Sequence, residues 1–91
     1  MKIADQVFEG LRQLHPEQRR TIRAALRSLD TGAPTDSKPL TDALEGFYRL
    51  RVGKFRIIYR HLHDGEISCE FMDTRATVYE SFLSLREFLP E

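Results

Sequence analysis

The spacing of the apolar residues changes at Gly46, and this change limits the folds that the sequence can adopt. Before it, apolar residues recur at helical spacing, as Ile22, Ala25, Leu26 and Leu29 do at i, i+3, i+4 and i+7. After it, apolar and polar residues alternate, which is typical of strands with one buried face. The change predicts an α+β domain in which helices come first and an antiparallel sheet follows.

The N-terminal part predicts a helical hairpin. Asp5 is expected to cap a first helix whose apolar residues are Val7, Phe8, Leu11 and Leu14. Pro16 begins a second helix, because proline suits the first helical turn. Residues 1–4 are expected to make a very short edge strand. Residues 31–39, rich in proline, glycine and small polar residues, are expected to form a loop.

The second half predicts a three-stranded antiparallel meander over residues 47–52, 55–62 and 66–73. Gly53-Lys54 and Asp64-Gly65 are the expected turns, and the second is a strong hairpin signal. A short amphipathic helix is expected to follow and to end at Pro90. Its apolar residues are Phe82, Leu85, Phe88 and Leu89. The fold class is therefore α+β, with an N-terminal helical hairpin packed on a small twisted antiparallel sheet and a short C-terminal helix.

Three arginines are expected to converge on one side of this sheet. If the helical hairpin covers Tyr48, Leu50 and Val52, then Arg49 and Arg51 point to the opposite side. Arg56 joins them, because its strand pairs with theirs and it is out of phase with its apolar neighbours. A single arginine on a strand is usually only solvated. Alternation therefore predicts three guanidinium groups on one sheet surface, where arginine could act as a bidentate donor to phosphate.

Charge and cysteine content restrict the function further. The net charge is zero, which counts against a protein that coats nucleic acid. Residues 46–63 nevertheless hold five basic residues and no acidic one, whereas residues 64–91 hold two basic and seven acidic residues. The single cysteine, Cys69, excludes an internal disulfide, fits a reducing cytoplasm and is expected to be a small buried apolar residue. No segment resembles a signal peptide or a membrane span.

Residues 44–59, read as LEGFYRLRVGKFRIIY, closely resemble the RelE/ParE superfamily of type II toxin–antitoxin toxins. Residues 73–79, read as DTRATVY, look like the closing segment of that family. The resemblance implies one toxin domain over residues 1–91, located in the cytoplasm and neutralised by a cognate antitoxin, with a toxin–antitoxin hetero-oligomer left open. For RelE-like members it implies cleavage of mRNA on the ribosome by basic side chains, without a metal or cofactor.

The resemblance also implies roles for single residues. Arg49, Arg51 and Arg56 match catalytic basic residues of the sheet, Tyr79 matches the tyrosine near the C-terminus, and Arg75 is the nearest basic substitute for a residue that Asp73 replaces. Lys54 and Arg60 are expected to contact RNA. Tyr79 has two open interpretations, a base-stacking or hydrogen-bonding residue and a packed aromatic. His61 and His63 are two metal-ligand types without a third, so we expect no metal site.

Two other functions stay open. Asp73 stands where some active members of the family carry a basic residue. This departure favours a ParE-like inhibitor of DNA gyrase, which needs no nuclease site, or a non-toxic homologue that only binds its antitoxin. The sequence alone does not separate these functions from mRNA cleavage.

Overall fold

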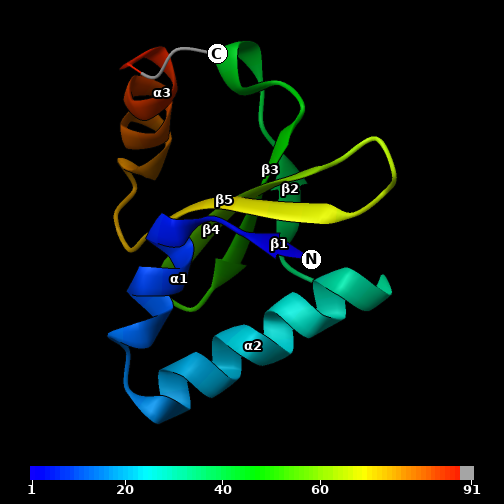
Figure 1. Cartoon of the computed structure of the whole chain (residues 1–91), viewed down its shortest axis with the longest axis vertical. Coiled ribbons are helices and arrows are strands. Elements are labelled where there is room, and N and C mark those ends of the chain that lie inside the picture. Colours follow the sequence, from blue (N-terminus) through cyan, green and yellow to red (C-terminus); the bar gives the residue numbers. More distant parts are fainter. Residues whose placement is uncertain (89–91) are drawn as a thin grey trace.

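The structure is a computed structural model that describes residues 1–88. Its centre is a five-stranded sheet in the order β1-β5-β4-β3-β2. The strands are β1 (Lys2–Ile3), β2 (Ser37–Pro39), β3 (Phe47–Val52), β4 (Phe55–His61) and β5 (Ile67–Asp73). Strand β1 runs parallel to β5, and the other neighbours are antiparallel. Helices α1 (Asp5–Arg12) and α2 (Pro16–Thr31) lie on one side of the sheet and α3 (Val78–Phe88) on the other (Figure 1).

The predicted order of a helical hairpin, a meander and a C-terminal helix is confirmed. The three predicted strands are present, and the second turn is only slightly wider than expected, from Leu62 to Glu66. The Leu62 amide still donates to the Glu66 carbonyl (2.7 Å). Gly65 has a φ of 84°, which explains why glycine suits this turn. The expected helix end at Pro90 lies outside the described residues.

The prediction of a loop over residues 31–39 is wrong at its end, where Ser37–Pro39 forms β2 beside β3. Lys38 pairs with Arg49, and the Arg51 amide donates to the Asp36 carbonyl just before the strand (2.9 Å). Pro39 is tolerated because β2 is at the edge of the sheet, where a missing N–H breaks no ladder. A three-residue strand is too short for alternation to reveal it.

The first helix begins one residue earlier than predicted, because Ala4 and not Asp5 is the N-cap. The Ala4 amide donates to the Cys69 carbonyl (2.9 Å), which extends the pairing of the short edge strand β1 with β5. Two residues later, the Gln6 side-chain amide donates to the Met72 carbonyl (2.7 Å) and accepts from the Met72 amide (2.8 Å). Gln6 therefore satisfies the edge of β5 where β1 has already ended.

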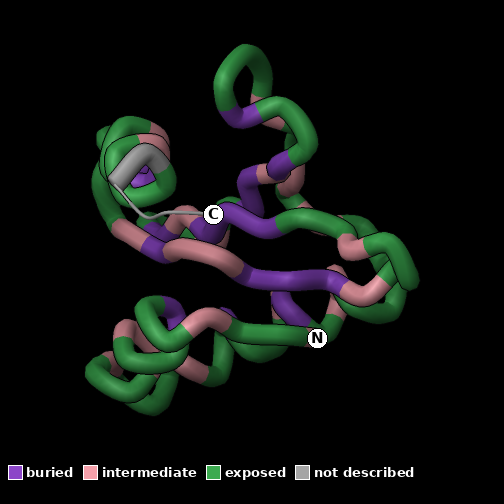
Figure 2. Tube along the Cα trace, turned by 45° about the horizontal axis from the view of Figure 1, so that its top comes forward, coloured by how far each residue is buried: buried purple, intermediate pink, exposed green. Residues whose placement is uncertain are grey.

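Apolar residues pack on both sides of the sheet. Leu50 and Ile57 face α1 and α2, and pack with Val7, Ile22 and Leu26. A second cluster lies under α3 on the opposite side and comprises Leu44, Phe47, Ile58, Val78 and Phe82. In Figure 2 the buried stretches follow the central strands, while the outer turns of α1 and α2 are largely exposed. The sheet is thus the middle of three layers, and α3 leaves part of its side uncovered.

Candidate functional site

The predicted arginines occupy the side of the sheet that α3 partly covers. Alternation along β3 places Arg49 and Arg51 on the same side as Phe47, and alternation along β4 places Arg56 with Ile58. We call the sheet surface that bears Arg49, Arg51 and Arg56 the arginine face. The three side chains share this face as predicted, but their surroundings differ.

Arg51 and Arg56 face each other directly across β3 and β4. Arg51 is exposed and Arg56 is half-buried. The Arg51 Nε donates to the Gly53 carbonyl (3.4 Å), and the Arg56 Nη1 donates to the Thr74 carbonyl (3.3 Å). Among the side chains that the structure describes, those of residues 1–86, no carboxylate lies within 4.0 Å of either guanidinium. Each keeps free N–H donors, so the pair can bind an anion.

Arg49 is different, because its guanidinium is already engaged inside the protein. Its residue is only 9% exposed, and its Nη2 donates to the Asp36 Oδ1 at 2.9 Å. Its Nε is buried and lacks a hydrogen-bond partner. Asp36 comes from the segment before β2, so the ion pair fastens that segment onto β3. This contact orients Arg49 along the sheet and leaves fewer of its donors for a ligand.

Asp73 ends β5 beside Arg56, as its register partner on the next strand. Its Oδ1 accepts from the amides of Thr74 (2.6 Å) and Arg75 (3.3 Å), so the carboxylate caps the turn that follows. Arg75 is exposed on this turn and does not lie on a continuation of β5. The turn is nevertheless tied to the site, because its Thr74 carbonyl holds Arg56.

Tyr79 lies in the first turn of α3, half-buried against the second apolar cluster. Its other side lines a groove of about 350 Å³. The remaining walls of this groove are Lys38, Pro39, Leu40, Thr41 and Leu44. Tyr79 is thus associated with the edge strand β2, whose Lys38 is the cross-strand neighbour of Arg49.

Lys54 and Arg60 stand at opposite ends of β4. The Lys54 ammonium lies at the β3–β4 turn, 5.5 Å from the centre of the Phe55 ring. Arg60 pairs with Phe47 across the strands, at the end of the sheet away from Arg51 and Arg56. Its Nε is 3.5 Å from the Glu70 Oε2. The basic stretch of the sequence is therefore divided between two ends of one sheet.

Comparison with solved structures identifies the architecture, whereas no family model and no curated protein sequence matches the chain. A chain of the RelB–RelE antitoxin–toxin complex from Methanococcus jannaschii superposes with a TM-score of 0.68 at 20% identity, over 90% of this chain and 99% of that one. The RelE–RelB complex from Pyrococcus horikoshii gives 0.65 at 25% identity, over 82% and 92%. The YoeB–YefM complex from Staphylococcus aureus gives 0.67 at 21% identity, over 79% and 91%.

The chain has the RelE fold. The resemblance predicted from residues 44–59 is confirmed at this level, since the helical hairpin, the meander and the C-terminal helix all belong to that fold.

Two contributors to the arginine face of this RelE fold were not predicted. Asp36 gave no signal, because nothing in a polar segment indicates which strand residue it will meet. Arg86 reaches the sheet from α3, with its guanidinium carbon 4.7 Å from the centre of the Phe47 ring and 5.9 Å from that of Phe82. Helical spacing could have revealed Arg86, because it follows Phe82 by four residues on the same helix face.

The remaining candidates are structural in this RelE fold. Cys69 is fully buried, as predicted, and burial raises the pKa of its thiol to about 11. His61 packs edge-on against the rings of Tyr48 and Tyr59. In residues 1–86, whose side chains the structure describes, no three side chains of His, Cys, Asp or Glu gather into a metal-binding group. The same residues contain no helix that is long and apolar enough to cross a membrane.

Proposed function

We propose that this chain is the toxin of a type II toxin–antitoxin module and that it cuts mRNA on the ribosome in the cytoplasm. The observation that carries the proposal is the pair of facing guanidinium groups, Arg51 and Arg56, at an uncovered end of a RelE-type sheet. No carboxylate of residues 1–86 lies within 4.0 Å of either group. Like charges on directly opposite strand positions repel, so an anion bound between the two guanidinium groups would be favoured.

The chemistry that fits this pair is attack of a ribose 2′-oxygen on the adjacent phosphorus, which breaks the bond from phosphorus to the 5′-oxygen and leaves a 2′,3′-cyclic phosphate. Water accepts the 2′-proton and supplies a proton to the departing 5′-oxygen. Negative charge then develops on the phosphate oxygens. Arg56 holds the scissile phosphate and Arg51 stabilises the developing charge through further N–H donors. Arginine is too basic to remove the 2′-proton at neutral pH, so both act as donors and not as bases. Arg49 has a structural part in this proposal, because its ion pair with Asp36 holds the segment before β2 against β3, next to the two other arginines.

The ribosome is part of the proposal for an electrostatic reason. A chain with zero net charge attracts free RNA weakly, because affinity for RNA depends on neutralising phosphates. A ribosome that holds the message in one place would supply the positioning that the protein lacks.

The test is expression of the wild type and of Arg56→Ala without an antitoxin, with primer extension on a translated message. We expect cuts from the wild type and a loss of roughly a hundred- to a thousand-fold for Arg56→Ala, the usual cost of losing a preorganised donor. Lys2→Ala, which removes an exposed charge from β1, is the matched control and should cut normally. The assignment fails if the wild type makes no cuts or if Arg56→Ala cuts equally well.

Inhibition of DNA gyrase is the second candidate, and Asp73 is the observation that favours it. Its carboxylate stands next to Arg56 in the sheet and reduces the positive charge at the site. A purified protein that blocks supercoiling without affecting translation would establish this function. Harmless overexpression without an antitoxin would instead point to a homologue that only binds its partner.

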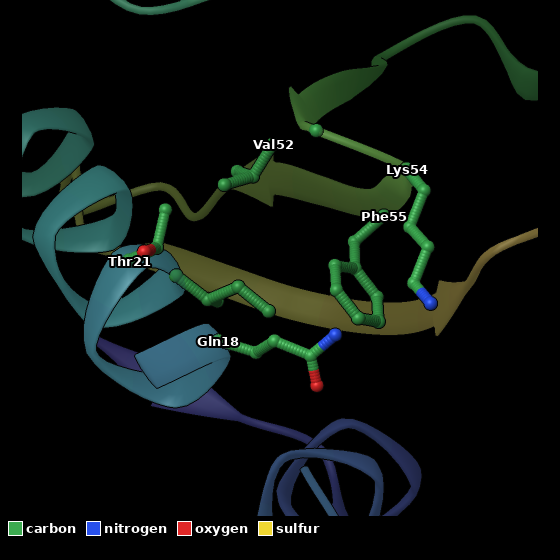
Figure 3. A pocket seen from close by; sticks show the side chains of 7 residues that line it. Gln18, Thr21, Val52, Lys54 and Phe55 are labelled. Carbon is green, nitrogen blue, oxygen red and sulfur yellow. The ribbon is translucent and has the colours of Figure 1, made fainter. Parts of the chain in front are cut away.

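The antitoxin partner has a suitable place in an apolar groove of about 380 Å³ between α2 and the β3–β4 hairpin. Figure 3 shows Gln18 and Thr21 on one wall and Val52, Lys54 and Phe55 on the other. An apolar antitoxin side chain would fill it, with a carboxylate toward Lys54. Thr21→Arg, which fills the groove from its exposed rim, should weaken capture of the co-expressed product of the neighbouring gene. Unchanged capture would show that the antitoxin does not bind in this groove.

A further inference from the structure

Asp73, at the end of β5, belongs to the same cross-strand row as the two arginines assigned to the phosphate. It is the register partner of Arg56, which in turn is the register partner of Arg51. Neighbouring strands lie about 4.8 Å apart, and directly opposed residues share one side of a sheet. The row therefore brings a carboxylate to the anion site, where binding of the phosphate alone does not need one.

The Asp73 carboxylate uses only one of its oxygens inside the protein. Its Oδ1 accepts from the amides of Thr74 (2.6 Å) and Arg75 (3.3 Å). In the part of the chain that the structure describes, no donor binds Oδ2 and no basic group lies within 4.0 Å of it. Only arginine Nε atoms are both buried and without a partner there, so Oδ2 reaches solvent. One oxygen fixes the carboxylate, and the other is free to accept a proton.

This end of the sheet has no other evident group to take a proton from a ribose hydroxyl. Arginine stays protonated at neutral pH, and histidine is the side chain most often used for this purpose. The histidines of the chain lie elsewhere. His15 is between α1 and α2, and His61 and His63 are at the far end of β4 from Arg56. From Arg56 to His61 the strand rises by about 17 Å.

Two other carboxylates border the arginine face, and neither is free beside the anion site. Asp36 has its Oδ1 in the ion pair with Arg49, at 2.9 Å from the Nη2. Glu45 precedes β3, whereas Arg51 is the fifth residue of that strand. About 13 Å of strand, from the first residue to the fifth, therefore lies between Glu45 and Arg51. Asp73 is the carboxylate whose position fits the reaction.

We propose that the Asp73 carboxylate is the final acceptor of the 2′-proton when the message is cut. The inference rests on the proposed ribosomal cleavage and names a further residue of that site. As the 2′-oxygen bonds to phosphorus, the water that takes its proton passes a proton to Oδ2. As the bond from phosphorus to the 5′-oxygen breaks, Oδ2 returns the proton through water to the 5′-oxygen. No proton is gained or lost in the cycle, and the carboxylate is regenerated.

The proposal predicts the opposite of what charge alone would do. A negative group beside Arg56 weakens the attraction of the site for a phosphate. If Asp73 acted only through its charge, its neutralisation should strengthen binding of the message and speed the cut. If Asp73 accepts the proton, neutralisation should slow the cut although the message binds as well as before or better.

The experiment measures the single-turnover rate of cutting, with the toxin in excess over message-loaded ribosomes. It compares Asp73→Asn, which keeps an Oδ1 acceptor for the turn but cannot take the proton, with Asp64→Asn. The control is matched, because the Asp64 Oδ1 also accepts a backbone amide in a turn, that of Glu66 at 2.9 Å, far from Arg56. We expect Asp73→Asn to lose about a hundredfold or more in rate, the usual contribution of a positioned proton acceptor. Asp64→Asn should cut as the wild type does.

A second measurement separates proton transfer from binding. Ribosomes are loaded with a message that has a 2′-deoxynucleotide at the mapped cut position, so the toxin binds but cannot cut. Asp73→Asn should bind these ribosomes at least as tightly as the wild type. Urea denaturation of the variants detects a folding defect. Asp73→Ser, which can also cap the turn but cannot take the proton, should lose as much rate as Asp73→Asn.

Three outcomes would overturn the inference: Asp73→Asn cuts as fast as the wild type or faster, Asp64→Asn loses as much rate, or Asp73→Asn no longer binds the deoxy message. Failure of the proposed function is recognised separately. A wild type that makes no cuts ends the cleavage proposal and this inference together. A wild type that cuts, with an Asp73→Asn variant that cuts equally well, ends this inference alone.

Discussion

Arg51 and Arg56 are direct cross-strand partners with their guanidinium groups on the same side of the sheet. Opposite-charge pairs are the stabilising arrangement at such positions, and like charges destabilise. Asp73, the partner of Arg56 on β5, offsets part of this repulsion, and a bound anion would offset more of it. A substitution that removes the repulsion should therefore raise the free energy of unfolding and lower the activity, because the same substitution removes a group that binds the anion.

Arg51→Glu should accordingly make the protein more stable and less active. An opposite-charge pair in place of the repulsion should raise the free energy of unfolding by about 0.2 to 1 kcal/mol. Urea denaturation measures the gain, and primer extension on a translated message measures the loss. Lys2→Glu makes the same charge change on β1 and should alter neither. A variant that loses stability together with activity would show that Arg51 has a structural role.

Asp36→Ala should destabilise the protein although Asp36 lies in an exposed segment. Without its carboxylate, the nearly buried Arg49 guanidinium loses its ion pair, and an unsatisfied buried group costs about 1 to 3 kcal/mol. Asp30→Ala, another exposed aspartate, should have little effect. In a double-mutant cycle, Asp36→Ala should cost much less once Arg49 is already alanine. Full additivity of the two changes would mean that the pair contributes nothing.

Gln6→Ala should weaken the edge of β5. It removes two hydrogen bonds to the Met72 backbone, and we expect a loss of about 1 to 3 kcal/mol in the free energy of unfolding. Hydrogen exchange of the Met72 amide should become faster than in the wild type. Gln13→Ala, at the exposed end of α1, is the control. Unchanged exchange at Met72 would contradict the role of Gln6.

Cys69 should make the protein less stable at high pH. Burial raises the pKa of its thiol from 9.0 to about 11, so the native state holds the proton more tightly than the unfolded state. This contribution is complete below pH 9 and is lost as the pH rises toward 11. The difference in stability between the wild type and Cys69→Ala, followed by urea denaturation, should therefore shrink over this range. A difference that stays constant would show that the thiol does not ionise on unfolding.

The strands could be predicted from the sequence because alternation alone determines which side of a sheet a residue occupies. Leu50 and Ile57 had to face one way, and Arg49, Arg51 and Arg56 the other. Alternation does not determine how deeply a side chain is buried. Arg49 and Arg51 have the same phase on the same strand, yet one is nearly buried and the other exposed. The difference comes from Asp36, which is brought to β3 by a strand too short to recognise.

Two other features could not be predicted from the sequence, because in each of them a side chain makes hydrogen bonds that a neighbouring backbone segment usually makes. Gln6 takes the place of a neighbouring strand beside Met72, and no pattern marks a helical glutamine for that use. Asp73 caps the turn after β5 through its own side chain, which ends the strand and carries Arg75 off the sheet. The first contact joins residues that are 66 positions apart in the sequence, and the second is a local cap that alternation along the strand does not reveal.

The hydrogen bond from Arg56 to the Thr74 carbonyl links the candidate site mechanically to the C-terminal helix. Thr74 belongs to the short turn that connects β5 to α3, and Val78 and Phe82 of α3 seal Phe47 and Ile58 of the sheet. One short turn therefore holds two contacts at once, the hydrogen bond that anchors Arg56 and the start of the helix whose Val78 and Phe82 are buried on the sheet. A substitution that disturbs the packing of α3 should for this reason also change the position of the Arg56 guanidinium.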